Sequence, residues 1–443
     1  MRLGRRVGGL VSYGLYCGCA PLGNDSHLTP TDRRVSRQIP EIPCADLQLQ
    51  ASNCEIKYHT FFFSQSLTET AVKNALHYDK GEDAQFVSWA IEDFLGQGDN
   101  YASTVTSVRV KYTQNGEDKE VSYIVKLKKK REGGSSSYFD DMTFEKEGRF
   151  FIELCPLLNA ELLEVGLTPL KVPRCCHSTW SENQDFLFLV DLRPKGFKRY
   201  DRKKVLDDSH ANLVLQELAR LHAASFLLRK KMKDDLVSSS STLAFLMGYG
   251  TGSEWFKDAT SRGCEIFEEQ LRRGSFDVIG HGDCCTNNML VRYNAKENPV
   301  EVLFLDFQLC RQASLAVDLN YFFFSNFDRK DRKEKMGQYL SLYHSSFAKV
   351  LASASLTMPY TVEEITKEFK RKNTYGIICG SILIPLLVSE TQEVIDFDSA
   401  SGGCAKGYVE ELRQNAVRML ANNPLLKPRM TDSFEDLKES HGL

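Results

Sequence analysis

The chain has 443 residues, of which 42% are hydrophobic, enough for a packed core and two lobes. Its 56 basic and 59 acidic residues give a net charge of −3, which excludes the basic excess typical of nucleic-acid-binding proteins. No apolar run reaches the ~18 residues that cross a bilayer, so we expect no stable membrane insertion.

The cysteines favour a reducing compartment. There are 13 of them, an odd number, and they include the neighbours Cys175-Cys176 and Cys284-Cys285, which cannot easily bridge each other. We therefore expect a cytoplasmic protein with free thiols. No second ligand pair lies near Cys17 and Cys19, so we expect no zinc site.

The first 50 residues have no sustained hydrophobic period, and we predict an extension outside the fold. A targeting segment is the alternative, because three arginines precede an uncharged stretch from Val7 to Leu22. After a capped helix start near Ser66, the pattern predicts a three-stranded antiparallel meander over 86–95, 102–112 and 121–127. Its first turn, with Gly96 and Gly98, could cover nucleotide phosphates, although a plain hairpin turn is the alternative.

Lys126 lies inside the third apolar strand, an unfavourable place for an ammonium group without a partner. A helix predicted over 143–158 carries Glu147, placed to reach back to it. A purely structural ion pair is equally compatible with these two residues.

A buried strand at 186–190 ends at Asp191, where we predict a hinge between an N-terminal lobe (51–190) and a C-terminal lobe (191–425). Ser209 is expected to cap the first helix of the C-terminal lobe, and His222 on that helix to be a satisfied core histidine. Further amphipathic helices follow to about residue 424, and we expect residues 426–443 to form a loose tail.

Two apolar runs, Met289 to Tyr293 and Val300 to Leu305, flank a polar turn and predict a β-hairpin. A hairpin places Asn288 and Asp306 side by side, with Asp283 just upstream on the same rim. Such oxygen-bearing side chains suit Mg²⁺, which fills its other positions with water and substrate phosphates. This arrangement points to phosphoryl transfer. Asp318 is expected to cap a helix or anchor the loop, rather than bind metal.

Asp283 and Asn288 are five residues apart, the interval between the Asp and Asn of the protein-kinase catalytic loop, and Asp306-Phe307 matches the metal-binding Asp-Phe. Protein kinases have Arg at the position of Gly282 and Gly at the position of Gln308. With Gly282 and Gln308, the two motifs of this chain resemble those of the aminoglycoside phosphotransferase and choline kinase group instead. Within that group the chain resembles the ecdysteroid kinase-like, or CHK kinase-like, family. The matching segments are Gly98 to Ser103, Phe144 to Glu147, Leu218 to Ser225, His281 to Asp283, Leu305 to Gln308 and Asp318 to Phe322.

The resemblance implies an α+β, bilobal protein-kinase-like fold, with an antiparallel β-sheet in the nucleotide-binding N-terminal lobe and a mainly helical C-terminal lobe. It also implies an ATP-dependent kinase that phosphorylates a hydroxyl group of a small, lipophilic molecule, ecdysteroid-like or another alcohol. Carried over by position, the implied roles are catalytic base for Asp283, Mg²⁺ ligands for Asn288 and Asp306, phosphate-binding lysine and its partner for Lys126 and Glu147, and phosphate turn for Gly96, Gly98, Asn100 and Ser103.

Two departures from the family pattern bear on ligands. Cys284-Cys285 replace a usual Leu-Trp, from which we expect a smaller, more open pocket wall, and Val190 replaces an acidic residue, which bears on adenine binding.

An idle kinase-like protein that binds a lipophilic ligand is the alternative function. A protein kinase is disfavoured, because no Ala-Pro-Glu segment follows Asp306. The pattern leaves the acceptor alcohol and the oligomeric state open.

Overall fold

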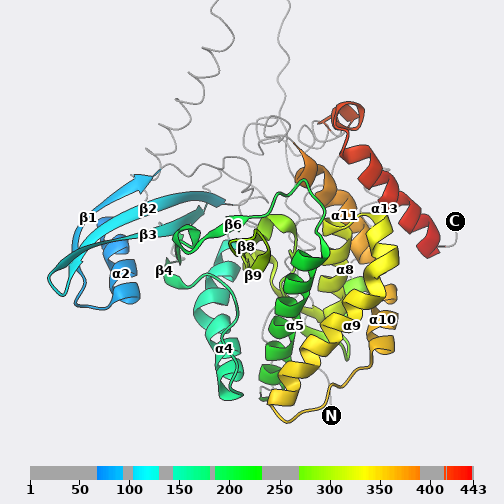
Figure 1. The fold of residues 1–443 in the computed structure, drawn as a ribbon, viewed down its shortest axis with the longest axis horizontal. Helices are drawn as coiled ribbons and strands as arrows, with labels where there is room; N and C mark the ends of the chain where they lie inside the picture. The colour runs from blue at the N-terminus through cyan, green and yellow to red at the C-terminus, as the bar shows by residue number, and fades with distance from the viewer. Residues whose placement is uncertain are drawn as a thin grey trace, which may run out of the picture. The chain divides into compact units, whose positions relative to one another are not determined.

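The computed structural model describes residues 67–92, 103–128, 143–179, 185–231, 269–389, 414–415 and 417–441. All of them belong to one compact unit, Glu55–Leu443. Elements are labelled as in Figure 1. No helix in these described ranges is long and apolar enough to cross a membrane.

A five-stranded antiparallel sheet forms the first part, in the order β1-β2-β3-β5-β4. The strands are β1 (Gln85–Glu92), β2 (Ser103–Gln114), β3 (Glu117–Lys128), β4 (Cys175–Thr179) and β5 (Phe186–Val190). β2 and β3 are joined at Asn115 and Gly116, whose positive φ angles of 56° and 75° suit a tight hairpin turn. The predicted meander is confirmed, and β4 and β5 extend it.

Helix α2 (Glu69–Lys80) covers one face of this sheet (Figure 1). The Thr68 hydroxyl caps it by accepting from the Ala71 N–H at 3.3 Å. Its apolar face packs against alternate residues of β2 and β3, among them Val108, Tyr123 and Val125. Because side chains alternate along a strand, Ser122, Ile124 and Lys126 point to the opposite face.

The helix predicted over 143–158 is present and is longer than expected. Residues 143–149 are helical, a π-helical segment follows at Phe150–Leu154, and α4 continues over Cys155–Glu164. The chain then returns to the sheet through β4 and β5, so this helix lies in sequence between β3, which carries Lys126, and β4.

The second part is mainly helical. Its helices are α5 (Asp208–Lys231), α8 (Leu315–Asn326), α9 (Arg329–Ser353), α10 (Val362–Arg371) and α11 (Asn373–Val388); its short strands are β6 (Phe197–Arg199), β7 (Asp277–Gly280), β8 (Met289–Tyr293), β9 (Pro299–Phe304) and β10 (Arg311–Ser314). α5 packs on α9, and α8 on α11 (Figure 1). Every residue of this mostly apolar helix α8 is buried, and its buried polar residues include Asp318. The predicted α+β class is confirmed.

Two expectations were wrong, one about the residue that caps α5 and one about the C-terminal tail. α5 begins at Asp208, and it is Asp207, not Ser209, whose carboxylate accepts the His210 N–H at 3.0 Å. The tail is not loose: α13 spans Leu426–His441 and packs on α11. Its Asp436 pairs with Arg329 at 2.9 Å and with Arg332. The acidic residues of the tail thus find cations on α9, a distant partner that local pattern does not reveal.

Candidate active site

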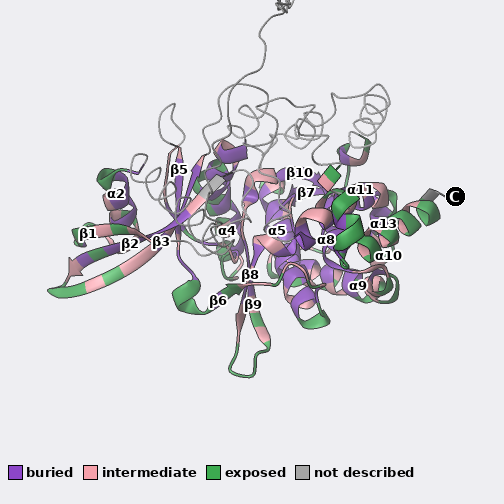
Figure 2. Ribbon diagram, turned by 90° about the horizontal axis from the view of Figure 1, so that it is seen from above, coloured by how far each residue is buried: buried purple, intermediate pink, exposed green. Residues whose placement is uncertain are grey.

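The β8–β9 hairpin gathers the predicted oxygen ligands. The Leu305 N–H donates to the Asn288 carbonyl at 2.9 Å, which places Asn288 beside the end of β9, as predicted. The Asn288 side chain donates from Nδ2 to the Asp283 carbonyl at 3.0 Å. Its amide oxygen therefore points away from that carbonyl. The hairpin tip, by contrast, is exposed (green in Figure 2).

Lys126 lies between two carboxylates. Its Nζ is 2.8 and 2.7 Å from the two Glu147 oxygens and 3.4 Å from Asp306 Oδ1. The side chains of Lys126, Glu147 and Asp306 are 10%, 3% and 20% exposed. Burial lowers the pKa of Lys126, but the charges of Asp306 and Glu147 outweigh burial and raise it. The predicted pair is present, and Asp306 makes it a lysine cluster of three ionisable groups.

Asp306 has an unusual backbone for a residue with a side chain, with φ 64° and ψ 70° in the left-handed region. The next residue, Phe307, is fully buried and stacks on Phe150 with ring centroids 3.7 Å apart. This stacking fixes the turn that follows Asp306 against the helical segment that carries Phe150. Asp306 Oδ1 is buried and has no hydrogen bond within the described residues; it faces the Lys126 ammonium at 3.4 Å and keeps lone-pair capacity for a further cation.

Asp318 on α8 anchors the loop 281–288. Its carboxylate accepts the His281 N–H at 2.5 Å, the Gly282 N–H at 2.9 Å and a hydrogen bond from His222 Nε2 at 3.0 Å. Burial alone would raise the pKa of Asp318, but the hydrogen bond from His222 and the charges of His222, His281 and Arg311 lower it to about 2. Asp318 is therefore an anionic anchor and His222 a buried, satisfied histidine, both as expected.

Glycine is required at position 282. The residue has φ +85°, and a Cβ there would lie 2.1 Å from the Leu309 carbonyl oxygen. This close approach lets the loop 281–288 lie against the turn that follows Asp306.

His281 ties that loop to β9. Its Nδ1 accepts the Asp283 N–H at 3.2 Å, so Nε2 carries the proton that it donates to the Leu305 carbonyl at 2.9 Å. The backbone of Asp283 is thereby fixed relative to the residue that precedes Asp306.

The carboxylate of Asp283 is partly exposed at the rim. Its Oδ1 accepts from the Tyr321 hydroxyl and, at 3.6 Å, from the Cys285 thiol. Burial and the nearby charge of Asp306 raise the pKa of Asp283. Asp283, Asn288 and the lysine cluster thus surround the two ends of one hairpin.

The ecdysteroid kinase-like family model matches residues 97–274 and 253–356, a span that carries the matched motifs described above. The chain belongs to the ecdysteroid kinase-like family. No curated protein sequence matches it.

Several solved structures of kinases are similar at low sequence identity. An aminoglycoside-3'-phosphotransferase of type VIII is 14% identical, with 70% of this chain and 100% of that chain covered and a TM-score of 0.35. Choline kinase LicA from Streptococcus pneumoniae is 11% identical, with 73% and 99% covered and a TM-score of 0.35. A microcompartment-associated aminopropanol kinase is 11% identical, with 82% and 100% covered and a TM-score of 0.37.

The family's phosphate turn falls largely outside the described residues. Gly96, Gly98 and Asn100 belong to that segment, and Ser103 is described only as the first backbone position of β2. The role of these four residues stays a prediction.

The expectation about Cys284 and Cys285 was wrong. Cys284 is completely buried in the main core, and Cys285, 3% exposed, packs with Tyr321 and Tyr375. Neither side chain forms an open pocket wall. Burial raises the pKa of both thiols well above the usual value, so they stay protonated. All described cysteines, including both neighbouring pairs, are free thiols.

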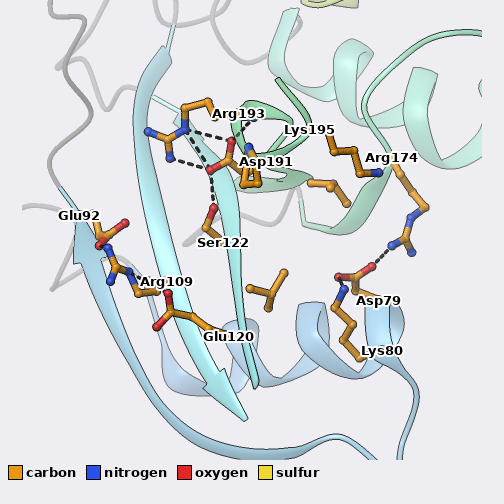
Figure 3. A pocket seen from close by; sticks show the side chains of 13 residues that line it. Asp79, Lys80, Glu92, Arg109, Glu120, Ser122, Arg174, Asp191, Arg193 and Lys195 are labelled. Atoms are coloured by element: carbon orange, nitrogen blue, oxygen red, sulfur yellow. Dashed lines mark hydrogen bonds and ion pairs between the residues drawn. The ribbon is translucent and has the colours of Figure 1, made fainter. Parts of the chain in front are cut away.

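The predicted hinge lines a hollow of about 630 Å³, shown in Figure 3. Asp191 accepts hydrogen bonds from Ser122 and Arg193, and Arg193 also reaches Ser107 at 2.6 Å. Ser122 points to the same face of β3 as Lys126 and lies four residues away, about 13 Å along the strand. The lining residues are Asp79, Lys80, Glu92, Arg109, Glu120, Val121, Ser122, Arg174, Val190, Asp191, Arg193, Pro194 and Lys195.

The oxygen donors at the rim fit a hard cation. Across the described ranges no three or more His, Cys, Asp or Glu residues group as a metal site. The carboxylate of Asp306 and the amide oxygen of Asn288 offer two ligands, the small protein share that Mg²⁺ takes when phosphates supply others. The buried Asp306 oxygen without a hydrogen bond is the observation that supports this fit.

Sequence reasoning missed Tyr321 as a site residue, because it opens an aromatic run that is typical of core. The available signal was its spacing: Tyr321 lies three residues after Asp318, and residues at that spacing share a helix face. A helix face that carries the loop anchor also faces the loop.

Proposed function

We propose that the protein is an ATP-dependent phosphotransferase that transfers the γ-phosphoryl group to a hydroxyl of a small, lipophilic molecule, ecdysteroid-like or another alcohol. Membership of the ecdysteroid kinase-like family supports a kinase-type activity. The single observation that carries the proposal is the lysine cluster, which meets Asp283 and Asn288 around the ends of the β8–β9 hairpin.

Each residue has a role that follows from its contacts. Lys126 is charged and is held by Glu147, so its ammonium can pair with phosphate oxygens of ATP. Asn288 and Asp306 would hold Mg²⁺. When bound, that ion neutralises charge on the β- and γ-phosphates.

In the proposed reaction, Asp283 acts as the general base. Its carboxylate takes the proton of the acceptor hydroxyl as the hydroxyl oxygen forms a bond to the γ-phosphorus. The bond from that phosphorus to the bridging oxygen breaks, and ADP leaves with the electron pair. Loop contacts to Asp318 and His281 hold the base in place during this transfer.

Replacement of Asp283 tests the proposal. Asp283→Asn keeps the side-chain shape but removes the proton acceptor, so turnover should fall about 10²- to 10⁴-fold. Mg-ATP binding should change little, because the lysine cluster is intact. The measurement is ADP release from Mg-ATP with a panel of steroid and amino alcohols, together with Mg-ATP titration calorimetry.

The same assay separates the alternative function. A carrier would bind a steroid or amino alcohol, yet the unmodified protein would release no ADP above background with any of them. Unchanged turnover in Asp283→Asn would instead remove Asp283 from the reaction while leaving the kinase activity in place.

A further inference from the structure

The two oxygens of the Asp283 carboxylate have different surroundings. Oδ1 accepts from the Tyr321 hydroxyl and from the Cys285 thiol, the latter at 3.6 Å. The amide of Asn288 is a further donor that favours the charged form of this carboxylate. Oδ1 is therefore the oxygen restrained by Tyr321 and Cys285.

Tyr321 is itself held rigidly. It is 5% exposed and packs with Val317, Tyr375 and Cys379, all on α8 or α11. Burial and the charge of Asp283 raise the pKa of the Tyr321 phenol well above its ordinary value, so the hydroxyl remains a donor. Because Asp318 lies on the same helix, α8 fixes both the backbone of the loop and the side chain of its aspartate.

Resting on the proposed function of Asp283 as base, we infer that Tyr321 and Cys285 are positioning residues. They hold Oδ1 so that Oδ2 faces the acceptor hydroxyl. Neither residue needs to touch the acceptor or ATP for this role.

A restraint on Oδ1 matters because the terminal torsion of a carboxylate is soft. The rotation about Cβ–Cγ has broad minima, so a carboxylate without partners samples many orientations. Misplacement of a reacting group by about 1 Å can cost 10²-fold in rate. The phenol donates a charge-assisted hydrogen bond, whereas a thiol is a weak donor, so Tyr321 carries most of the restraint.

The first test is Tyr321→Phe, which removes the hydroxyl and keeps the ring. We expect kcat for ADP release to fall about tenfold, as for loss of one hydrogen bond to a charged group. The KM for Mg-ATP should stay within about twofold, because the lysine cluster does not contact Tyr321. Water serves as the acceptor in Mg-ATP alone, and the steroid and amino-alcohol panel supplies further acceptors.

Asp283→Asn provides the coupling test. If Tyr321 acts through the carboxylate, Tyr321→Phe should lower kcat no further in the Asp283→Asn background. An equal fall in both backgrounds would overturn the inference.

Tyr375→Phe is the matched control. Tyr375 lies in the same apolar cluster, and its hydroxyl contacts Arg311 instead of Asp283. The two variants should lose similar thermal stability, but only Tyr321→Phe should lower kcat. A similar fall in kcat for both would show a merely structural role and overturn the inference.

Substitution of Cys285 is an independent test of the restraint on Asp283 Oδ1, and it applies even if Tyr321→Phe does not fold. Cys285→Ala should lower kcat about two- to threefold, since it removes a weak donor, and Cys285→Ser should restore it. Equal kcat in the alanine and serine variants would contradict a role for this donor.

The two levels of the proposal fail differently. If the unmodified protein releases no ADP under any condition, the proposed function fails and the inference fails with it. If it turns over Mg-ATP and Tyr321→Phe keeps full kcat, only the inference fails.

Discussion

Two carboxylates from distant segments contact the Lys126 ammonium directly, whereas the loop 281–288 is held mainly through its backbone. The lysine cluster joins β3, the helix before α4 and the turn after β9 by charge. The loop instead donates backbone N–H groups to Asp318 and His281. One side of the candidate site depends on ion pairs and the other on a hydrogen-bonded frame.

This difference bears on what each side can accept. The lysine cluster has two carboxyl groups for one ammonium group, and burial raises the pKa of Glu147 to about 7, so an additional cation would favour the ionised form of both carboxyl groups. The backbone anchor of the loop needs no ligand, because the carboxylate of Asp318 accepts its hydrogen bonds from His222, His281 and Gly282. We therefore expect the lysine cluster to respond to ligands and substitutions more strongly than the loop.

Lys126→Met gives the largest expected effect on stability. It leaves the buried Glu147 and the half-buried Asp306 without their cation, and removal of one partner of a buried pair costs about 3–5 kcal/mol of unfolding free energy. Urea unfolding followed by circular dichroism measures this loss. The matched control is Lys73→Met, which breaks an exposed pair with Glu69 and should cost less than about 1 kcal/mol. Equal losses of unfolding free energy in the two variants would mean that the lysine cluster stabilises the fold no more than an exposed ion pair does.

Gly282→Ala probes the backbone frame of the loop. Its left-handed φ and the clash with the Leu309 carbonyl together should cost about 3 kcal/mol. Gly116→Ala is the control, since Gly116 also has a positive φ of 75° but nothing within 4 Å of the added Cβ. That variant should lose only about 1 kcal/mol in the same urea experiment. Similar losses would show that close packing at Gly282 contributes little.

The smallest expected effect concerns the pH dependence of the loop anchor. The pKa of Asp318 falls from 3.8 to about 2 on folding, so its ionisation stabilises the fold above about pH 4, by about 2 kcal/mol. This contribution is lost as pH falls through about 2. The free-energy difference between the unmodified protein and Asp318→Asn should therefore be constant from pH 6 to 4 and narrow below pH 4. A difference that stays constant to pH 2.5 would contradict this account.

The hairpin and the Lys126 pair could be predicted from the sequence because their signals are local. Two apolar runs around a polar turn fix the β8–β9 hairpin, and a lysine within an apolar strand requires a partner. The third member of the lysine cluster needed the fold, since Asp306 meets Lys126 only when β3 and the hairpin are brought together.

Other features depend on contacts that no local pattern carries. Cys284 and Cys285 were expected at a pocket wall because they replace the Leu-Trp usual in the family, but the loop turns their side chains inward, Cys284 to the main core and Cys285 beneath Asp283. The tail was expected to be loose because it is charged, yet Asp436 meets two arginines of α9 and the segment is helical.

The stacking of Phe150 on Phe307 links the two carboxylates that hold Lys126. Phe307 directly follows Asp306, and Phe150 lies three residues after Glu147 on the same helical segment. Glu147 and Asp306 are therefore linked twice, once through their ion pairs with Lys126 and once through the stacked rings of Phe150 and Phe307. A displacement of the Asp306 backbone would have to separate the rings or draw the helix of Glu147 along, so the stacking couples the backbones that carry the two acidic groups.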